Sequence, residues 1–267
     1  MRPIKKFFDY LRKGHSPIWY LRKLWFNCIN FREFRRRKHW IETKKSPRHA
    51  AELSRNGFSF VSGIDPSGIV EYCTKLCGTI DPTDSPPKPN SGKDFWKILI
   101  SSDNIDEHSL IKDFAQNIVF EDIASHYLGT KAVLSNVSLM KSYPTETEPK
   151  HSQTWHLDAD DSRLVVFYVY INDVTADNGP FEFLPKTAIK KFYTPRFFRK
   201  HSFSDEELVL INNRHMDFSI TGSAGTMFAC DTASYYHRGS RCKSSTRIAL
   251  SIRYSTFSGL YPVTKIT

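Results

Sequence analysis

The second half of the chain is a series of short β-rich runs separated by turns, and this pattern limits the fold more than any other feature. Turn signals such as Asn178-Gly179-Pro180 and Gly222-Ser223 separate the runs. The runs cover 132–143, 164–172, 180–184, 216–221, 225–230 and 246–257. Helical patterns come before them. Helices followed by many short strands predict a mainly β domain with flanking α-helices, namely a jelly roll with N-terminal helices against one face.

The first half of the chain contains helices with well-marked ends. Two short helices are expected before residue 45, and the second of them opens with Ser16 as N-cap and Pro17 in its first turn. Further helices are expected from Ser46-Pro47 to Gly57, from Asp65-Pro66 to Gly78 and from Ser109 to Leu128, with a strand at 58–61. We therefore divide the chain into a helical N-terminal segment, 1–45, and a main domain, 46–267.

Positive charge is concentrated at the N-terminal end. Residues 1–50 contain fifteen Lys or Arg and three Asp or Glu, a net charge of +12, whereas the whole chain carries +10, so the remainder carries −2. Basic residues beside aromatic ones suit a helix on an anionic membrane surface. A helix packed on the main domain with a solvated basic end is an equally open interpretation. Nucleic-acid binding is less favoured, because a basic patch alone has little specificity.

The cysteines favour a reducing compartment, and the hydropathy predicts no membrane-spanning helix. The five cysteines are scattered, and Cys73 and Cys77 are expected as buried thiols in a helix. The longest apolar run, Leu164–Ile171, is far shorter than the roughly 20 residues of a membrane-spanning helix. The basic N-terminus lacks the apolar stretch of a signal peptide. We expect a cytoplasmic protein, with peripheral contact at a membrane surface through residues 1–45 left open.

A possible metal site begins at Trp155-His156-Leu157-Asp158. On an extended strand, residues i and i+2 point the same way, so His156 and Asp158 present an imidazole and a carboxylate on one face. With a distal histidine, His237, they would form the 2-His-1-carboxylate set of non-haem iron sites.

A second HxD, His215-Met216-Asp217, competes for this assignment. It lies only 22 residues before His237, whereas His156 lies 81 residues before it and leaves room for intervening strands. We therefore favour His156. We expect His215 and His151 not to bind the metal.

An arginine follows His237 at a distance that suits an organic cosubstrate. Arg247 lies ten residues after His237, on the expected strand 246–254. A planar guanidinium binds a carboxylate through two hydrogen bonds and stays charged. Alone, Arg247 would be an ordinary surface residue of a strand. In register with His237 and the upstream HxD, it indicates a site for a dicarboxylate.

Three segments of this chain resemble the phytanoyl-CoA dioxygenase family of iron(II)- and 2-oxoglutarate-dependent oxygenases. They are the HxD at 156–158, "YVYINDVTADNGPFEFLPKT" at 168–187 and "GTMFACDTASYYHRGSRCKSSTRIALSIRY" at 225–254. The stretch "NGFSFVSGI" at 56–64 is similar to the family's opening strand. Together they span Asn56 to Tyr254. The resemblance implies a cupin-like double-stranded β-helix.

The resemblance also implies the site residues. It assigns Fe(II) to His156, Asp158 and His237, and the far carboxylate of 2-oxoglutarate to Arg247. The family has an aromatic residue eleven positions before the glycine of the NGP turn, which gives Tyr168 here; its hydroxyl would donate to 2-oxoglutarate, although a core tyrosine is as good an interpretation. With O₂, these cofactors would hydroxylate an unactivated C–H bond and release succinate and CO₂.

Two departures from the family pattern bear on the reaction. After the NGP turn the chain has Pro185-Lys186-Thr187-Ala188, without the family's glycine and histidine, so substrate choice cannot be carried over. Asp158 is retained, whereas halogenating relatives have a small residue there, so hydroxylation is expected.

Readings from other classes stay open at this point. A non-redox cupin-like isomerase or metal-binding protein would use the same His/Asp/His set but would not need Arg247. A membrane- or nucleic-acid-associated protein with an inactive β domain would not need the metal ligands. The substrate itself is not predicted: a lipid- or glycan-linked compound is attractive from the charge, and a small metabolite, an acyl thioester or a nucleic acid stays open.

Overall fold

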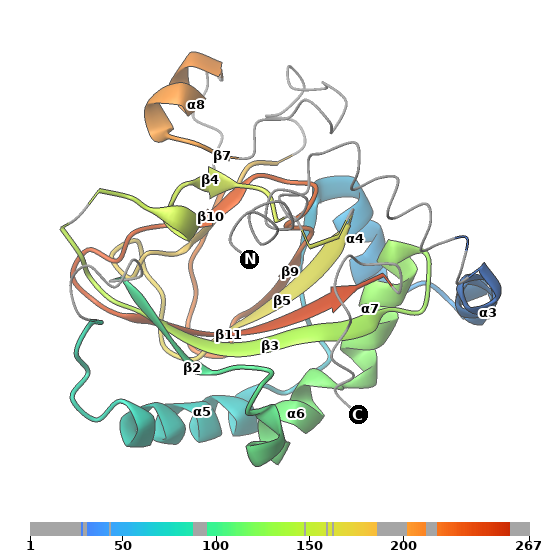
Figure 1. Ribbon diagram of the computed structural model, residues 1–267, viewed down its shortest axis with the longest axis horizontal. Helices are drawn as coiled ribbons and strands as arrows, with labels where there is room; N and C mark the ends of the chain where they lie inside the picture. Colours follow the sequence, from blue (N-terminus) through green and yellow to red (C-terminus); the bar gives the residue numbers. More distant parts are fainter. Residues whose placement is uncertain are drawn as a thin grey trace, which may run out of the picture.

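Two antiparallel β-sheets face each other, and helices cover the outside of the larger sheet (Figure 1). This arrangement comes from a computed structural model, which describes residues 28, 31–42, 44–87, 95–146, 148–158, 160–161, 163–185, 202–211 and 218–256. The predicted mainly β fold with flanking helices, a cupin-like double-stranded β-helix, is confirmed. The described residues do not include His215, residues 186–188 or the helices predicted before residue 28.

The larger sheet has six strands, and β11 at its centre makes the longest pairings. Their order across the sheet is β1 (Phe58–Phe60), β9 (Met227–Cys230), β5 (Leu164–Tyr170), β11 (Arg247–Ser255), β3 (Val133–Ser142) and β2 (Trp96–Ile100). The smaller sheet has five short strands, in the order β7 (Ser202–Phe203), β4 (Trp155–His156), β10 (His237–Gly239), β6 (Phe181–Phe183) and β8 (Phe218–Ile220). All strand pairings among the described residues are antiparallel.

Strand β5 is apolar throughout because both of its faces are covered. Alternate residues on a strand point to opposite faces. Val165, Phe167 and Val169 pack into the core between the sheet and the helices. Tyr168 and Tyr170 lie with the core between the two sheets. The continuous hydrophobic run therefore reflects a strand buried on two sides rather than a membrane segment.

The helices occur mainly in the first half of the chain. They are α3 (Phe31–Glu42), α4 (Arg48–Asn56), α5 (Ser67–Ile80), α6 (Ser109–Ala115), α7 (Ile118–Leu128) and α8 (Asp205–Ile211), with short 3₁₀ turns η1 (Ile105–Glu107) and η2 (His151–Gln153). Figure 1 places α5 and α6 beneath the larger sheet, with α4 and α7 at one end. Helix α4 ends, as predicted, at Gly57, whose φ of +85° and close approach to the Tyr235 ring both require glycine.

Several predicted boundaries were wrong. The single helix expected from Ser109 to Leu128 is two helices, because Asn117 caps the second one by accepting a hydrogen bond from the backbone N–H of Val119. Helix α5 continues two residues past Gly78. Strands β2, β7 and β10 were not predicted at all.

The C-terminal part of segment 1–45 packs on the main domain. Arg37 and Lys131 exchange two hydrogen bonds, at 3.1 and 3.2 Å, and Lys44 forms an ion pair of 3.0 Å with Asp122 on α7. The Trp40 ring lies under the ammonium groups of Lys44 and Lys131. The opposite side of α3 exposes the basic residues Arg35, Arg36, Lys38 and His39. Helix α3 therefore packs on the main domain and exposes basic residues to solvent, as the packed-helix interpretation expected.

Cys73 and Cys77 are buried thiols, as predicted. Cys73 and Cys77 lie in the core between helices and larger sheet, and burial raises their pKa values to about 12 and about 11. At neutral pH both stay protonated, which makes them unreactive. Among the described residues, no helix is long and apolar enough to cross a bilayer.

Candidate metal centre and cosubstrate pocket

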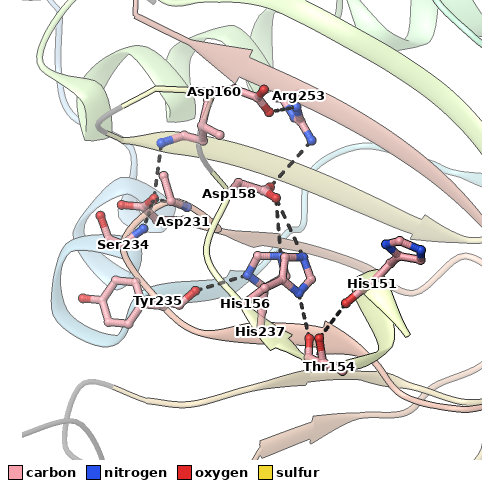
Figure 2. A network of polar contacts seen from close by, with 12 residues as sticks. His151, Thr154, His156, Asp158, Asp160, Asp231, Ser234, Tyr235, His237 and Arg253 are labelled. Atoms are coloured by element: carbon pink, nitrogen blue, oxygen red, sulfur yellow. Dashed lines mark hydrogen bonds and ion pairs between the residues drawn. The ribbon is translucent and has the colours of Figure 1, made fainter. Parts of the chain in front are cut away.

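His156, Asp158 and His237 meet between strands of the smaller sheet. The two histidines are direct partners in the β4–β10 pairing. Their Nε2 atoms lie 3.9 and 4.0 Å from Oδ1 of Asp158 (Figure 2). Asp158 is the second residue after β4, and its backbone N–H donates to the carbonyl of Thr232 at 2.9 Å. One ligand atom from each of the three residues lies within 4.8 Å of the others, a spacing that would hold one metal ion.

Backbone carbonyls orient both imidazole rings. Nδ1 of His156 lies 2.8 Å from the Thr154 carbonyl, and Nδ1 of His237 lies 3.2 Å from that of Tyr235. A proton on Nδ1 that donates to a carbonyl leaves the lone pair of Nε2 for a metal. Burial, and next the neighbouring His156, lower the pKa of His237 to about 3. Neutral imidazole is the form that binds a metal.

The third ligand is an ionised carboxylate. Burial alone would raise the pKa of Asp158, but the charge of Arg253 and then the two histidines outweigh it, and the pKa falls to about 2. The donor set is therefore two imidazole nitrogens and one anionic oxygen. This is the 2-His-1-carboxylate set that binds Fe(II) and leaves coordination positions open.

A buried aspartate fixes the turn that leads into β10. Asp231 accepts hydrogen bonds from the backbone N–H groups of Ala233 and Ser234, both at 3.1 Å, and from that of Leu164 at 3.2 Å. The Tyr127 hydroxyl also donates to it, at 2.6 Å. Asp231 was not predicted, although an Asp followed by small polar residues is a recognisable turn signal. It positions the segment that carries His237.

The other histidines considered from the sequence do not join the cluster in the described structure. His151 is exposed on η2, where its carbonyl accepts a hydrogen bond from the Thr154 hydroxyl. This agrees with its predicted non-ligating role. His215 lies outside the described residues, so the preference for the first HxD over the second stays a prediction.

The metal centre opens into a cavity of about 330 Å³ between the two sheets. Its floor consists of residues that alternate along the inner faces of the larger sheet. They are Asn136, Ser138, Met140 and Ser142 of β3, Tyr168 and Tyr170 of β5, and Arg247, Ala249, Ser251 and Arg253 of β11. Phe181 of β6 closes one side and stacks on the His237 ring, with ring centroids 5.6 Å apart.

Arg247 lies in this cavity with an unused donor. Its Nη2 donates to the Ser142 hydroxyl at 3.3 Å, whereas Nη1 is buried without a hydrogen-bond partner. Its guanidinium also presses on Gly239, where a Cβ atom would lie 2.6 Å from Nη2. A buried, unpaired donor on a charged group is costly unless a ligand satisfies it. An acid such as 2-oxoglutarate fits this position.

Tyr168 packs as a core tyrosine and also lines the cavity, so both interpretations of this residue stay open. Its ring stacks on Phe228, with centroids 5.2 Å apart, and packs on Phe181, as a core tyrosine would. The residue also lines the cavity. Burial, and next the charge of Asp158, raise the pKa of its hydroxyl, which therefore stays protonated and able to donate.

Arg253 was missed from the sequence. It lines the cavity and forms ion pairs with Asp158 and Asp160. Its position could have been anticipated, because it follows Arg247 by six residues on one strand and an even spacing puts both side chains on the same face.

The NGP turn packs against the loop before Arg247. The Asn178 side chain accepts from the Thr175 backbone N–H at 2.9 Å and donates to the Thr246 carbonyl at 3.0 Å. Gly179 has a φ of +68°, and a Cβ atom there would collide with the backbone of 240–242. The turn therefore fixes the start of β11, which carries Arg247.

Comparison with known families agrees with this geometry. The sequence model of the phytanoyl-CoA dioxygenase family matches residues 54–244. The chain belongs to this family. The predicted family is confirmed, and so are the predicted iron and 2-oxoglutarate; the use of O₂ stays a prediction. The roles of the individual site residues stay predictions. A comparison with curated proteins found no match.

Solved structures of iron- and 2-oxoglutarate-dependent enzymes share the fold. EctD from S. alaskensis, crystallised with 2-oxoglutarate and 5-hydroxyectoine, is 20% identical with a TM-score of 0.56, over 80% of this chain and 77% of that one. The epimerase SnoN, in complex with Fe³⁺, alpha ketoglutarate and nogalamycin RO, is 15% identical with a TM-score of 0.57, over 81% and 86%. The carbocyclase SnoK is 13% identical with a TM-score of 0.52, over 80% and 85%.

Proposed function

We propose that this member of the family hydroxylates an unactivated C–H bond of a small molecule. One observation carries the proposal: half-buried Arg247, with a buried and unpaired Nη1, lines the same cavity as the His156, Asp158 and His237 cluster. A metal set and a separate carboxylate site in one cavity are what an iron enzyme with a dicarboxylate cosubstrate needs.

Each residue has a distinct part in the proposed reaction. His156, Asp158 and His237 would hold the iron, which together with 2-oxoglutarate and O₂ would supply the oxidising chemistry, with succinate and CO₂ as co-products. Arg247 binds the far carboxylate of the cosubstrate. Tyr168 donates a hydrogen bond to it. The aromatic rings of Phe181 and Phe228 keep water away from that side of the cavity.

Hydroxylation is the outcome we favour among those known for this fold. Related structures include an epimerase and a carbocyclase, as well as an enzyme crystallised with a hydroxylated ectoine. The carboxylate ligand Asp158 is present, as hydroxylation requires and halogenation does not.

The substrate and location are proposed from charge. Two of the related enzymes are solved with small molecules, 5-hydroxyectoine and nogalamycin RO. The exposed basic face of α3 is suited to an anionic surface, so a lipid- or glycan-linked substrate reached from the membrane surface is part of the proposal. All five cysteines are free, as in a cytoplasmic protein.

The alternative, a non-redox cupin-like isomerase or metal-binding protein, explains less. It accounts for the three metal ligands but gives no partner to the buried Nη1 of Arg247. For that reason we place it second.

Succinate release tests the proposal directly. The full chain is incubated with Fe(II) and 2-oxoglutarate against small-molecule, lipid and glycan panels, and succinate is measured together with the mass of each product. We expect substrate-dependent succinate and a gain of one oxygen atom. His237→Ala should remove this turnover and leave the fold intact. Full turnover by His237→Ala, or no succinate from the wild-type chain with any substrate, would count against the proposal.

A further inference from the structure

The two carboxylate oxygens of Asp158 face different groups. Oδ1 points toward the metal position and lies 3.9 and 4.0 Å from the two histidine Nε2 atoms. Oδ2 lies 3.6 Å from Nη2 of Arg253 on the other side (Figure 2). Oδ1 is thus the oxygen that pairs with the two histidine nitrogens, and Oδ2 is the oxygen that pairs with Arg253.

Arg253 is itself held in place from behind. Its second nitrogen, Nη1, pairs with Oδ2 of Asp160, two residues after Asp158. Its backbone is fixed between Asn136 of β3 and Val166 of β5 in the larger sheet. Figure 2 shows the guanidinium lying between the two aspartates. An arginine fork between two carboxylates is a rigid arrangement, because both branches are engaged.

We propose that Arg253, anchored by Asp160, is a positioning residue that restricts Asp158 to one metal-binding oxygen. An aspartate that binds through both oxygens fills two coordination positions, whereas one that binds through Oδ1 fills one. The position left open is needed for a bidentate cosubstrate and for O₂. Replacing a residue that orients a metal ligand typically lowers metal affinity or activity about ten- to a hundredfold.

The two arginines of β11 therefore have different partners. Arg247 keeps a buried Nη1 without a partner and so has a donor to offer to 2-oxoglutarate. Arg253 already pairs with Asp158 and Asp160. Both arginines line one cavity. The difference in their partners suits Arg247 to bind the cosubstrate and Arg253 to act through the metal ligand Asp158.

The test measures metal coordination without turnover. The inference rests on the proposed metal site. Co(II) is added to the full chain without cosubstrate, and its visible absorption spectrum reports the coordination. The 2-oxoglutarate Kd is then measured by calorimetry on the Co(II) form. The variants are Arg253→Gln, which frees Asp158, and Asp160→Asn, which removes only the anchor. The matched control is Arg238→Gln, because Arg238 also lies between two carboxylates, Glu182 and Asp205, but does not line the cavity.

We expect Arg253→Gln to bind Co(II) with a changed spectrum and to bind 2-oxoglutarate ten- to a hundredfold more weakly. Asp160→Asn should show the same spectral change to a smaller extent, and Arg238→Gln should show none. A Co(II) spectrum of Arg253→Gln identical to wild type would overturn the inference, even if the 2-oxoglutarate Kd rose. Loss of all Co(II) binding by a folded Arg253→Gln would overturn it too, because a freed carboxylate should still bind. Failure of the wild-type chain to bind Co(II) would instead refute the metal site itself.

Discussion

Replacing Arg247 with lysine tests the cosubstrate site while keeping its charge. The guanidinium offers two nitrogens on one edge: Nη1, buried without a partner, and Nη2, 3.3 Å from Ser142. The ammonium of lysine is a single point donor and cannot form the paired hydrogen bonds of that fork. The substitution therefore removes at least one hydrogen bond to a charged group, worth about 1.5–3 kcal/mol. That loss raises the 2-oxoglutarate Kd by roughly ten- to a hundredfold.

Iron binding should not change in Arg247→Lys, because Arg247 has no contact with the three metal ligands among the described interactions. Anaerobic calorimetry gives the Kd of Fe(II) and then that of 2-oxoglutarate on the iron-loaded chain. Arg55→Lys, on the exposed side of α4, is the control for a lysine replacement outside the cavity. An unchanged 2-oxoglutarate Kd in Arg247→Lys would refute the dioxygenase assignment and favour a non-redox metal protein.

Three further variants test neighbouring conclusions. Gly239→Ala places a Cβ atom 2.6 Å from Nη2 of Arg247, so it should weaken 2-oxoglutarate binding several-fold and leave Fe(II) binding intact. Gly68→Ala, whose Cβ atom meets nothing within 4 Å, should change neither Kd. Equal 2-oxoglutarate Kd values for the two variants would contradict the close packing. His215→Ala should keep Fe(II) binding that His156→Ala loses, and the reverse result in the same metal titration would transfer the site to the second HxD. A chain with Glu in place of Arg35, Arg36 and Lys38 keeps the Arg37 and Trp40 contacts, so it should stay folded but lose low-salt binding to anionic vesicles; co-sedimentation equal to wild type would exclude a membrane role for α3.

Long elements were predictable because they carry enough residues for a period to appear. Strands β5 and β11 and helix α4 match their predicted ranges within two residues at each end. Strands of two or three residues, such as β7 and β10, show no alternation and exist because a neighbouring strand offers backbone partners. The break at Asn117 was missed because the apolar pattern continues across it.

The residues of the site also divide into those that the sequence predicted and those that it did not. His156, Asp158 and Arg247 were recognisable because their residue types recur at short spacings along the chain, within the HxD and ten residues after His237. The roles of Asp160 and Asp231 depend on segments that meet only in the folded chain, so a local turn signal such as that at Asp231 does not reveal them. Asp231 lies 104 residues after its partner Tyr127.

Strand β11 shows why core and site in this fold are specified together. Leu250, Ile252 and Tyr254 face the helix-covered core, and the residues between them face the cavity. A slip of one residue in its pairing with β3 would put Arg253 into the apolar core and Ile252 beside Asp158. The cost of burying an unpaired arginine there exceeds that of most single mutations. The register that brings Arg247 and Arg253 to the cavity is therefore held by the apolar residues on the opposite face, and a change at Leu250 or Ile252 should reach the metal centre through the position of its neighbours.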